Sequence, residues 1–490
     1  MNHDTNKEQS DKILIKIKNL SVHTKDGTIL VEPVSLAIKA GQNLTILGET
    51  GSGKSLLAQA VMGALPDGLM VKGQIIIDGK VYHDGEGRLD AAKFRSLWGR
   101  QLAMLPQEPV RSLDPTMTAL GQVAESLEFV KQLTKATAKA QATQALDTLA
   151  LSHATHHYPH ELSGGMAQRV SFASATVSGA NMVIADEPTK GLDHKNKLIV
   201  ADMLAQVAKA GGCLLTITHD IEVASRLSGD NDLMMVMKKG KLLEQGYATD
   251  VLNHPKSDYA KELMSANPAT WVKGDTPTSD KPLLTLDNVA ISRGKKELFS
   301  GLNLTLCEGQ AVGLIGDSGI GKSSLGDMIC GLINPSKGSM TWHTKPARHQ
   351  VLKLYQDPPS AFAAGVTLGT LIDDVVRRHR LDKNEIAPLM DALGLHPDLL
   401  HRTSDGVSGG ELQRIAIMRA LMMKPVLLFA DEVTNRLDPI TQKTTLDLLT
   451  KACHAQNCTL IMASHDHELT RHYCDVVVDL GEYAGPTGQS

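Results

Sequence analysis

The sequence predicts an α/β protein built from two tandem copies of one domain. Two short segments carry this prediction: residues 48–55, GETGSGKS, and residues 316–323, GDSGIGKS, both of which fit the pattern G-x-x-x-x-G-K-[ST]. An apolar run precedes each segment and a helical pattern follows it. The apolar runs are residues 44–47 and 311–315, and the helical patterns are residues 56–62 and 324–329. A buried strand, a glycine-rich loop and a helix in this order form a phosphate-binding loop, so the sequence predicts two nucleotide-binding domains.

Each phosphate-binding loop, called a P-loop below, combines three kinds of group that bind phosphate. The glycines let backbone N–H groups point inward, and the following helix directs its positive end at the same anion. Lys54 and Lys322 add a charge on the β- and γ-phosphates, and the hydroxyls of Ser55 and Ser323 are suited to ligate magnesium. The predicted nucleotide-binding residues of the two loops are Gly48, Glu49, Thr50, Gly51, Ser52, Gly53, Lys54 and Ser55, and Gly316, Asp317, Ser318, Gly319, Ile320, Gly321, Lys322 and Ser323.

Composition and charge limit the classes of protein. The chain has 490 residues, enough for two or more domains, and a formal net charge of -4 without a broad basic stripe, which argues against nucleic acid as the main partner. No apolar run approaches the about 20 residues that cross a bilayer. The six cysteines are scattered without a C-x-x-C pair, which indicates buried thiols in a reducing cytosol.

Composition also divides the chain, because the polar, proline-containing stretch at residues 266–282 predicts a linker. The interval from the P-loop lysine to a later glutamine is shorter in the second half, Lys322 to Gln356 against Lys54 to Gln107. The second half is therefore expected to have lost part of an early β-rich region. The expected organisation is a flexible tail at 1–12, a first domain at 13–265, the linker at 266–282 and a second domain at 283–490.

Two carboxylates follow a short apolar run in each half. Asp186 and Glu187 end the run at residues 182–185, and Asp431 and Glu432 end the corresponding run of the second half. A buried strand that ends in two acids delivers them to a phosphate site, where the aspartates are predicted to hold magnesium, directly or through water. The glutamates are predicted to orient and polarise the attacking water. Taken alone, each acidic pair is about as well explained by a solvated turn. Because each pair follows a P-loop in the sequence, the catalytic interpretation is favoured.

A Ser-Gly-Gly segment opens a helical pattern in each half, and it is the most specific motif of the chain. Its residues are Ser163, Gly164 and Gly165 in the first half, and Ser408, Gly409 and Gly410 in the second. A helix start of this kind exposes N–H groups and a hydroxyl to an anion. The order of P-loop, glutamine, Ser-Gly-Gly helix, Asp-Glu pair and histidine, present twice between about residues 13 and 479, resembles the ATP-binding cassette (ABC) ATPases.

That resemblance implies a fold and an activity. Each half is expected to contain a RecA-like core, an antiparallel β subdomain, reduced in the second half, and a helical subdomain that carries the Ser-Gly-Gly helix. In this family the Ser-Gly-Gly helix of one half serves the P-loop of the other, which implies one ATP between Lys54 and Ser408 and another between Lys322 and Ser163. The chain is thus expected to be an ATPase whose two halves hold two ATPs between them.

The resemblance also implies roles for the remaining polar positions. Gln107 and Gln356 match the loop glutamine that senses magnesium and the membrane partner, and Asp193 and Asp438 match the aspartates that cross the seam between halves. Two histidines that follow apolar runs match the γ-phosphate histidines, with a structural role as the alternative. The expected catalytic residues are Glu187, Glu432, His219 and His465, and the expected magnesium ligands are Ser55, Gln107, Asp186, Ser323, Gln356 and Asp431.

The chain departs from the family pattern at the adenine position. An aromatic ring usually stacks on adenine just after the first strand, but Thr24 and Arg293 stand there in this sequence. Arg293 is able to stack through its guanidinium plane. In the second half Val433 replaces the usual proline and Arg436 stands in the seam loop. The sequence therefore predicts two hydrolysis sites that are unequal.

Further segments resemble one branch of the family, the oligopeptide, dipeptide and nickel importer ATPases. They are residues 107–109, QEP, residues 112–115, SLDP, and residues 158–162, YPHEL. Importers of this branch usually use two separate ATPase chains, and here the pair is fused. The implied partners are two membrane permease subunits and, through them, a substrate-binding protein, with this chain as a peripheral subunit on the cytoplasmic face of the inner membrane. The implied cofactors are ATP and Mg2+.

The sequence leaves the cargo and one alternative function open. Residues 61–73, VMGALPDGLMVKG, resemble the nickel-type members, which favours nickel or a metal chelate slightly over small peptides. The histidines between residues 153 and 160 argue little for a metal site, because His160 belongs to the family run and Pro159 breaks any regular helical face. The alternative function is a soluble twin-cassette ATPase that acts on the ribosome or on nucleic acid. The short, proline-containing linker argues against it, because that class usually has a long charged helix there.

Overall fold

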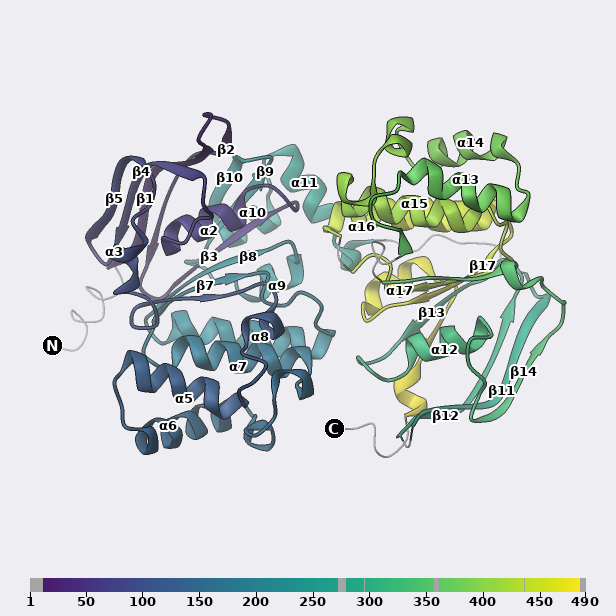
Figure 1. Cartoon of the computed structure of the whole chain (residues 1–490), viewed down its shortest axis with the longest axis horizontal. Coiled ribbons are helices and arrows are strands. Elements are labelled where there is room, and N and C mark those ends of the chain that lie inside the picture. The colour runs from purple at the N-terminus through teal and green to yellow at the C-terminus, as the bar shows by residue number, and fades with distance from the viewer. Residues whose placement is uncertain (1–11, 272–278, 295, 357–360, 436, 485–490) are drawn as a thin grey trace. The chain divides into compact units, whose positions relative to one another are not determined.

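The computed structural model describes residues 12–271, 279–294, 296–356, 361–435 and 437–484. It divides into two compact units, Met1–Met264 and Ser265–Ser490, which Figure 1 colours from purple to teal and from teal to yellow. The expected tail, except for Lys12, lies outside the described residues, as do Arg436 and residues 272–278 of the expected linker.

A six-stranded sheet forms the core of the first unit, in the order β10-β9-β3-β8-β7-β6. Neighbours pair in parallel from β9 to β6, and β10 pairs with β9 antiparallel. The strands are β3 (Gln42–Gly48), β6 (Leu102–Leu105), β7 (Met182–Asp186), β8 (Cys213–Thr218), β9 (Leu233–Lys238) and β10 (Lys241–Tyr247). On one face of the sheet, Ile184 and Leu215 belong to the apolar cluster that includes helix α2 (Lys54–Met62). On the other face, Val183 and Leu214 belong to the cluster that includes helix α8 (His194–Lys209). β7 and β8 are buried at every position because both faces of the sheet are covered.

An antiparallel sheet covers the P-loop helix of the first unit. Its order is β2-β1-β4-β5, and side chains of β1 such as Ile15 and Ile17 share one cluster with Leu57 of α2. The strands are β1 (Ile13–Thr24), β2 (Ile29–Lys39), β4 (Leu69–Ile77) and β5 (Lys80–Gly87). The P-loop helix is α2 (Lys54–Met62), and α8 (His194–Lys209) and α9 (Ile221–Arg226) pack on the opposite face of the core sheet.

A helical subdomain with a core of its own completes the first unit. It contains α5 (Ala119–Val130), α6 (Lys135–Thr148) and α7 (Gly164–Thr176). On α6, Ala138, Ala142 and Leu146 recur every fourth residue and are all fully buried, as one face of an α-helix requires. The remaining helices are α3 (Ala91–Arg95), α4 (Pro109–Ser112), α10 (Ala248–Asn253) and α11 (Asp258–Ser265).

The second unit repeats this plan with smaller sheets. Its core sheet is parallel in the order β15-β16-β17-β13-β18, and its antiparallel sheet has three strands, β12-β11-β14. The strands are β11 (Pro282–Arg293), β12 (Lys296–Cys307), β13 (Ala311–Ile315), β14 (Lys337–Trp342), β15 (Val351–Leu354), β16 (Leu427–Asp431), β17 (Thr459–Ala463) and β18 (Val476–Asp479). The helices are α12 (Lys322–Ile329), α13 (Leu368–His379), α14 (Ile386–Ala392), α15 (Gly409–Leu421), α16 (Pro439–Ala455) and α17 (His467–Tyr473).

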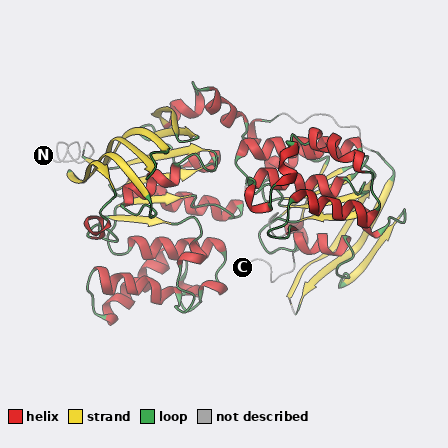
Figure 2. Ribbon diagram, turned by 45° about the horizontal axis from the view of Figure 1, so that its top comes forward, coloured by secondary structure: helices red, strands yellow, loops and turns green. Residues whose placement is uncertain are grey.

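The predicted fold class is confirmed. Each unit combines a mainly parallel α/β core, an antiparallel sheet and a layer of helices, and Figure 2 shows the strands of each unit flanked by helices. The antiparallel sheet has four strands in the first unit and three in the second, which agrees with the reduction that the sequence predicts. Short 3₁₀ helices connect the main elements at Ser152–Ala154, Pro159–Glu161, Pro268–Thr270, Arg348–Gln350, Lys383–Glu385, Pro397–His401, Ser404–Gly406 and Leu480–Tyr483.

The start of the expected linker packs onto the second unit. Trp271 follows a 3₁₀ helix, and its ring centroid lies 5.0 Å from that of His472 and 5.5 Å from that of Tyr473. Its indole Nε1 donates to the carbonyl of Ser265 at 2.9 Å. Among the described residues, no helix combines the length and the apolar character needed to cross a membrane.

We expect Phe299→Ala to destabilise the second unit by about 3–5 kcal/mol, because a fully buried aromatic ring is lost from its core. Phe299 lies on β12 beside the second P-loop, so its loss also removes the packing under that loop. The free energy of unfolding from guanidinium titration of the full chain checks this. The matched control is Phe129→Ala, whose ring is 73% exposed, with an expected change within about 0.5 kcal/mol. Equal effects of the two substitutions would contradict the prediction.

Candidate functional site

The first P-loop joins β3 to α2 and holds its lysine against the loop. The buried Nζ of Lys54 donates to the carbonyls of Gly48 and Glu49, both at 2.7 Å, and to Oγ of Ser52 at 3.2 Å. All three acceptors belong to the loop, so the positive charge stays beside it. Gly53 has φ 90°, and a Cβ there would lie 2.7 Å from Val31. Glycine is therefore required by backbone conformation and by space.

The second P-loop joins β13 to α12 in the same way. Nζ of Lys322 donates to the carbonyls of Gly316 at 2.6 Å and Asp317 at 3.2 Å. Gly321 has φ 116°, and a Cβ there would lie 3.0 Å from the ring of Phe299. The two predicted loops thus have the same local structure. The side chain packed against the last glycine of the loop differs: it is Val31 in the first unit and Phe299 in the second.

Asp186 ends β7 beside the first P-loop, and its surroundings suit a divalent cation. The carboxyl is buried beside the Ser55 hydroxyl, and its Oδ1 has no hydrogen-bond partner among the described residues. Burial raises the pKa of the Asp186 carboxyl, against the opposing effects of the Ser55 hydroxyl and the charge of Lys54. Mg2+ prefers oxygen ligands of these two kinds, so Asp186 and Ser55 fit the metal that the sequence predicts there.

Glu187 is held in an unusual backbone conformation next to Asp186. Its φ is 48°, in the left-handed region, and its backbone N–H donates to the carbonyl of Ile217 at 2.8 Å. Its carboxylate Oε1 lies 2.8 Å from Nδ1 of His219. Burial lowers the pKa of His219, but the hydrogen bond and charge of Glu187 outweigh it, so the net pKa is raised. The predicted base and the predicted histidine of the first unit therefore meet as an ion pair.

In the second unit, Asp431 is contacted by a lysine that the sequence analysis missed. Lys353 of β15 places its Nζ 2.9 Å from Oδ2 of Asp431 and 3.0 Å from Oδ1 of Asp327. Burial lowers the pKa of Lys353, but its bonds to Asp431 and Asp327 outweigh it and the pKa is raised overall. The first half has Met104 three residues before its loop glutamine, where the second has Lys353 before Gln356. Comparison of the halves at that position would have revealed the lysine.

Glu432 of the second unit contacts three polar side chains through its two carboxylate oxygens. Its Oε1 lies 2.9 Å from Nδ1 of His465, and its Oε2 accepts from Gln356 at 3.0 Å and from Asn435 at 2.8 Å. Burial raises the pKa of the Glu432 carboxyl. The nearby His465 and Lys322 lower it by more, so the pKa is lowered overall. Its φ of 49° matches that of its counterpart in the first unit. The structure thus brings Gln356, Glu432 and His465 together, and it adds Asn435, which no motif predicted.

The Ser-Gly-Gly segments begin α7 and α15, as the sequence predicts for a helix start. Ser163 caps α7 by accepting from the N–H of Met166 at 3.3 Å. Ser408 caps α15 by accepting from the N–H of Glu411 at 3.3 Å, and the Glu411 carboxylate accepts from the backbone N–H of Ser408 at 2.8 Å, which completes a capping box. The Ser408 hydroxyl also donates to that carboxylate at 2.7 Å. The pairing of each serine with the P-loop of the other unit stays a prediction.

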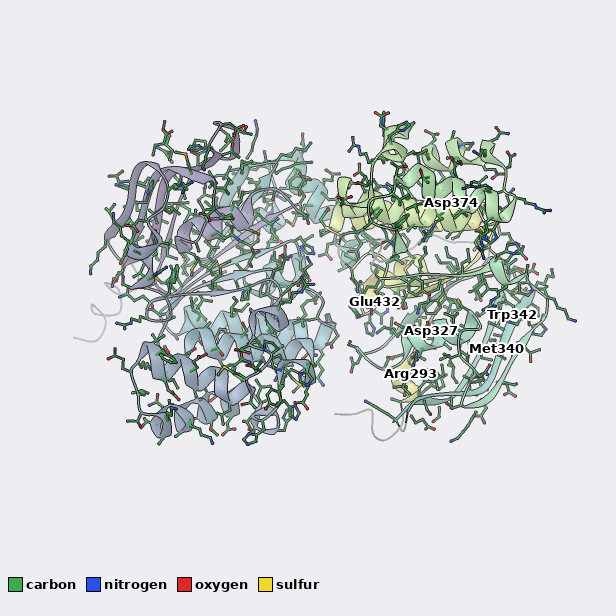
Figure 3. All side chains as sticks on the ribbon, in the orientation of Figure 1. Arg293, Asp327, Met340, Trp342, Asp374 and Glu432 are labelled. Carbon is green, nitrogen blue, oxygen red and sulfur yellow. The ribbon has the colours of Figure 1, made fainter. Side chains whose placement is uncertain are left out.

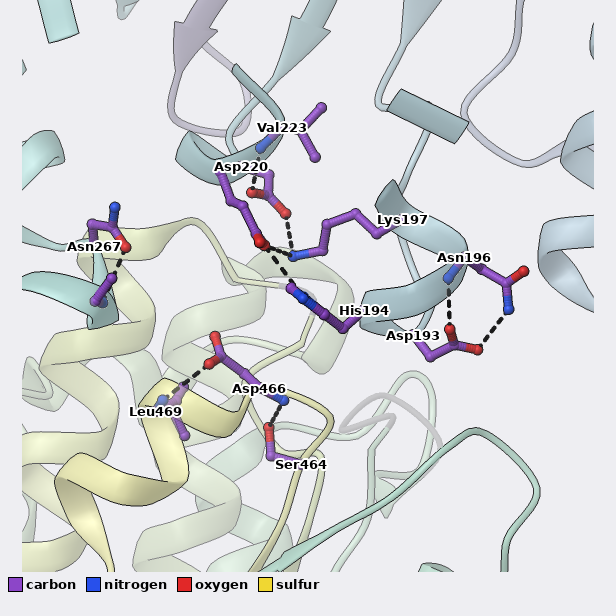
Figure 4. Close-up of polar contacts among 12 residues, drawn as sticks. Asp193, His194, Asn196, Lys197, Asp220, Val223, Asn267, Ser464, Asp466 and Leu469 are labelled. Atoms are coloured by element: carbon purple, nitrogen blue, oxygen red, sulfur yellow. Dashed lines mark hydrogen bonds and ion pairs between the residues drawn. The ribbon is translucent and has the colours of Figure 1, made fainter. Parts of the chain in front are cut away.

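The two predicted seam aspartates cap helices. Asp193 accepts from the backbone N–H and the side-chain Nδ2 of Asn196, both at 2.8 Å, as Figure 4 shows at the start of α8. Asp438 accepts from the N–H of Thr441 at 3.1 Å at the start of α16. A capping role accounts for both aspartates within their own units. A role across a seam stays a prediction.

The remaining predicted positions differ in their surroundings. Gln107 is exposed, just after β6. Arg293, predicted to stack on adenine, lies 2.9 Å from Asp327, and both are labelled in Figure 3. Thr24, the counterpart of Arg293, bonds Asp26 instead. Within the described ranges no group of three or more His, Cys, Asp or Glu side chains is suited to hold a metal ion.

Comparison with known proteins gives matches along nearly the whole chain. The profile of the family described as ABC transporter matches residues 31–190 and 299–435. The peptidoglycan transport ATP-binding protein YejF of Agrobacterium fabrum is 31% identical, over 94% of this chain and 89% of the relative. The glutathione import ATP-binding protein GsiA of Pectobacterium atrosepticum is 27% identical, over 96% of this chain and 86% of the relative.

A solved structure matches across both units. It is the archaeal ribosome recycling factor aABCE1 in complex with a ribosomal stalk protein, with a TM-score of 0.65 and 19% identity, covering 94% of this chain and 87% of that chain. At this level of identity the match shows a shared fold.

The raised pKa of His219 predicts a pH-dependent contribution to stability. The ion pair with Glu187 stabilises the folded state fully below about pH 6.5, the ordinary pKa of histidine, and the contribution is lost as pH rises through the raised value in the folded state. We expect His219→Gln to destabilise the chain more at pH 6 than at pH 8.5. Denaturant titrations of both proteins across this range measure the difference.

A second variant controls for the loss of the imidazole ring. Glu187→Gln removes the charge that raises the histidine pKa, so it is expected to flatten the same part of the pH profile. A destabilisation by His219→Gln that stays constant from pH 6 to pH 8.5 would contradict the assignment.

Proposed function

The chain belongs to the ABC transporter family and is an ATPase, and from this premise we propose that it is the energy-coupling subunit of an importer for small peptides. The observation that carries the proposal is the presence in one chain of two complete sets of P-loop, Ser-Gly-Gly helix, acidic pair and histidine. Relatives similar over nearly their whole length have names that refer to transport.

The cargo class follows from what those relatives are named for. One is a peptidoglycan transport protein and the other a glutathione import protein. Peptidoglycan contains short peptides and glutathione is itself a tripeptide. We therefore favour peptides over nickel or a metal chelate. The proposed partners are two permease subunits in the membrane and, through them, a substrate-binding protein, with this chain at the cytoplasmic face of the inner membrane.

The proposed mechanism assigns distinct work to the residues of each site. Each P-loop lysine binds the β- and γ-phosphates, and each glutamate beside the sheet end takes the proton of the attacking water. His219 and His465, which lie 2.8 Å and 2.9 Å from those glutamates, would contact the γ-phosphate. Intramolecular pairing would set Ser408 against the phosphates at Lys54, and Ser163 against those at Lys322. ATP binding would then draw the halves together, and hydrolysis would release them.

The proposed magnesium ligands are the same residue types in both halves. Ser55, Gln107 and Asp186 would serve the first site, and Ser323, Gln356 and Asp431 the second. When bound, the ion supplies positive charge to the β- and γ-phosphate oxygens as negative charge moves in the reaction. The buried Oδ1 of Asp186, which has no hydrogen-bond partner in the described part of the chain, supports the first set. The ion pair of Asp431 with Lys353 distinguishes the second set.

The alternative, a soluble twin-cassette ATPase on the ribosome or nucleic acid, has weaker support. The likeness to the ribosome recycling factor is one of fold, whereas the relatives with higher identity have names that refer to transport. We therefore retain the importer as the proposal.

Reconstitution with the two permease subunits and the binding protein tests the importer proposal. We expect small peptides to stimulate ATP hydrolysis, and nickel salts and chelated metals to leave it at the basal rate. Stimulation by nickel alone would overturn the peptide assignment. If no cargo stimulates hydrolysis and ribosomes co-purify with the chain, the alternative replaces the importer.

Neutralising each glutamate separately tests the two hydrolysis sites. Glu187→Gln is expected to lower ATP turnover by about 100-fold or more, because a general base typically contributes that much. Glu432→Gln is expected to lower turnover less. Steady-state phosphate release measures both variants, with nucleotide binding as the control for an intact fold. Full activity in either variant would contradict a hydrolytic role for that glutamate.

A further inference from the structure

Lys353 uses all of its hydrogen-bonding capacity inside the second nucleotide site. Its side chain is only 5% exposed, and its Nζ lies 2.9 Å from Asp431 and 3.0 Å from Asp327. It also donates to the backbone carbonyl of Ser323, in the second P-loop, at 2.9 Å. An ammonium has three donors, and these three oxygens satisfy them. Lys353 is therefore a fixed cation that bridges the P-loop and the acidic end of β16.

The first unit has an uncharged residue at the same place. Met104 is paired with Ile184 on β7, and Lys353 is paired with Phe429 on β16, each two residues before the aspartate that ends the strand. Residues two apart in a strand face the same side, so both positions stand beside their aspartate. Met104 packs against the apolar core of its unit. The first site therefore has a thioether where the second has a charge.

A second exchange accompanies this one. The sixth residue of the P-loop helix is Gln59 in α2 and Asp327 in α12. Asp327 contacts both Lys353, at 3.0 Å, and Arg293, at 2.9 Å. The second site therefore contains a continuous run of ion pairs from Arg293 to Asp431, in which Figure 3 labels Arg293 and Asp327. Neutral side chains, Thr24 and Gln59, occupy the corresponding positions of the first site.

The contact with Lys353 changes how strongly Asp431 attracts a divalent cation. A carboxylate already neutralised by an ammonium at 2.9 Å attracts a divalent cation less, and the ammonium repels that cation directly. Parting the pair is costly, because it leaves a buried amine without its partner. Oδ1 of Asp186 has no hydrogen-bond partner among the described residues, and the ammonium of Lys54 is bonded to P-loop carbonyls. Asp186 therefore lacks the direct ammonium contact that Lys353 makes with Asp431.

We propose that Lys353 takes the place of much of the metal's charge at Asp431, so that the second P-loop holds ATP with little dependence on a divalent cation. The first P-loop then binds ATP together with Mg2+ and is the faster site of hydrolysis. The proposal rests on the proposed function in one respect: both P-loops must bind ATP.

Counting bound Mn2+ tests the proposal without measuring activity. Electron paramagnetic resonance of the full chain, saturated with a non-hydrolysable ATP analogue, gives the number and affinity of bound Mn2+ ions. We expect two nucleotides and one tightly bound Mn2+ per chain, with the second ion at least about tenfold weaker. Asp186→Asn is expected to abolish the tight ion, and Asp431→Asn to leave it in place.

Reciprocal substitutions at the two matched positions provide the controls. Lys353→Met should give a second tight Mn2+, since it restores the residue of the first site and leaves Asp327 paired with Arg293. Met104→Lys should weaken the binding of Mn2+ at the first site. Lys353→Arg keeps the positive charge, so the chain should still bind one Mn2+ ion tightly.

Several outcomes would overturn the inference. Two equally tight Mn2+ ions in the unaltered chain, or an unchanged count in a folded, nucleotide-binding Lys353→Met protein, contradict it and leave the ATPase function intact. Loss of the tight ion in Asp431→Asn and not in Asp186→Asn contradicts it even if Lys353→Met fails to fold. Failure of the unaltered chain to bind nucleotide at all would instead overturn the proposed function.

Discussion

Each unit must hold several acidic groups together at the carboxyl end of a parallel sheet, next to a loop built for phosphate. Like charges repel strongly when they are buried, so each carboxylate needs a nearby partner. In the first unit the Ser55 hydroxyl and the charge of Lys54 act on Asp186, and His219 pairs with Glu187. The strands, the glycine loops and the left-handed turn at each glutamate all serve to bring these groups within contact distance.

The two units satisfy that requirement with different partners. The second unit neutralises Asp431 internally, with the ammonium of Lys353, and surrounds Glu432 with Gln356, Asn435 and His465. The first unit leaves a buried carboxylate oxygen of Asp186 without a hydrogen-bond partner among the described residues. A fused chain always contains one copy of each half, so one half is free to specialise in holding nucleotide while the other retains rapid hydrolysis. Divergence of this kind requires only a few side-chain exchanges around the P-loop.

Motif order predicted the fold because the motifs carry their own local structure. A P-loop requires a strand before it and a helix after it, and the structure has β3 and α2, then β13 and α12, at those places. The shorter interval between Lys322 and Gln356 predicted the smaller antiparallel sheet. Lys353 and Asp327 were not predicted because each acts through a contact between distant segments. Asn435 lies only three residues after Glu432, but it belongs to none of the motifs. The register of β15 against β16 sets Lys353 beside Asp431, and no local pattern specifies that register. The ion pair of Arg293 with Asp327 likewise joins distant segments, and the ability of Arg293 to stack on adenine stays a prediction.

The inequivalence of the two ATP sites is expected to confine most ATP hydrolysis to the first site. Vanadate trapping with a photoreactive ATP analogue tests this most directly, because vanadate retains nucleotide only where hydrolysis has occurred. Mass spectrometry of the labelled peptides then identifies the site. We expect label predominantly on peptides around the P-loop that contains Lys54. Equal labelling of the two P-loops, or label predominantly around Lys322, would contradict it.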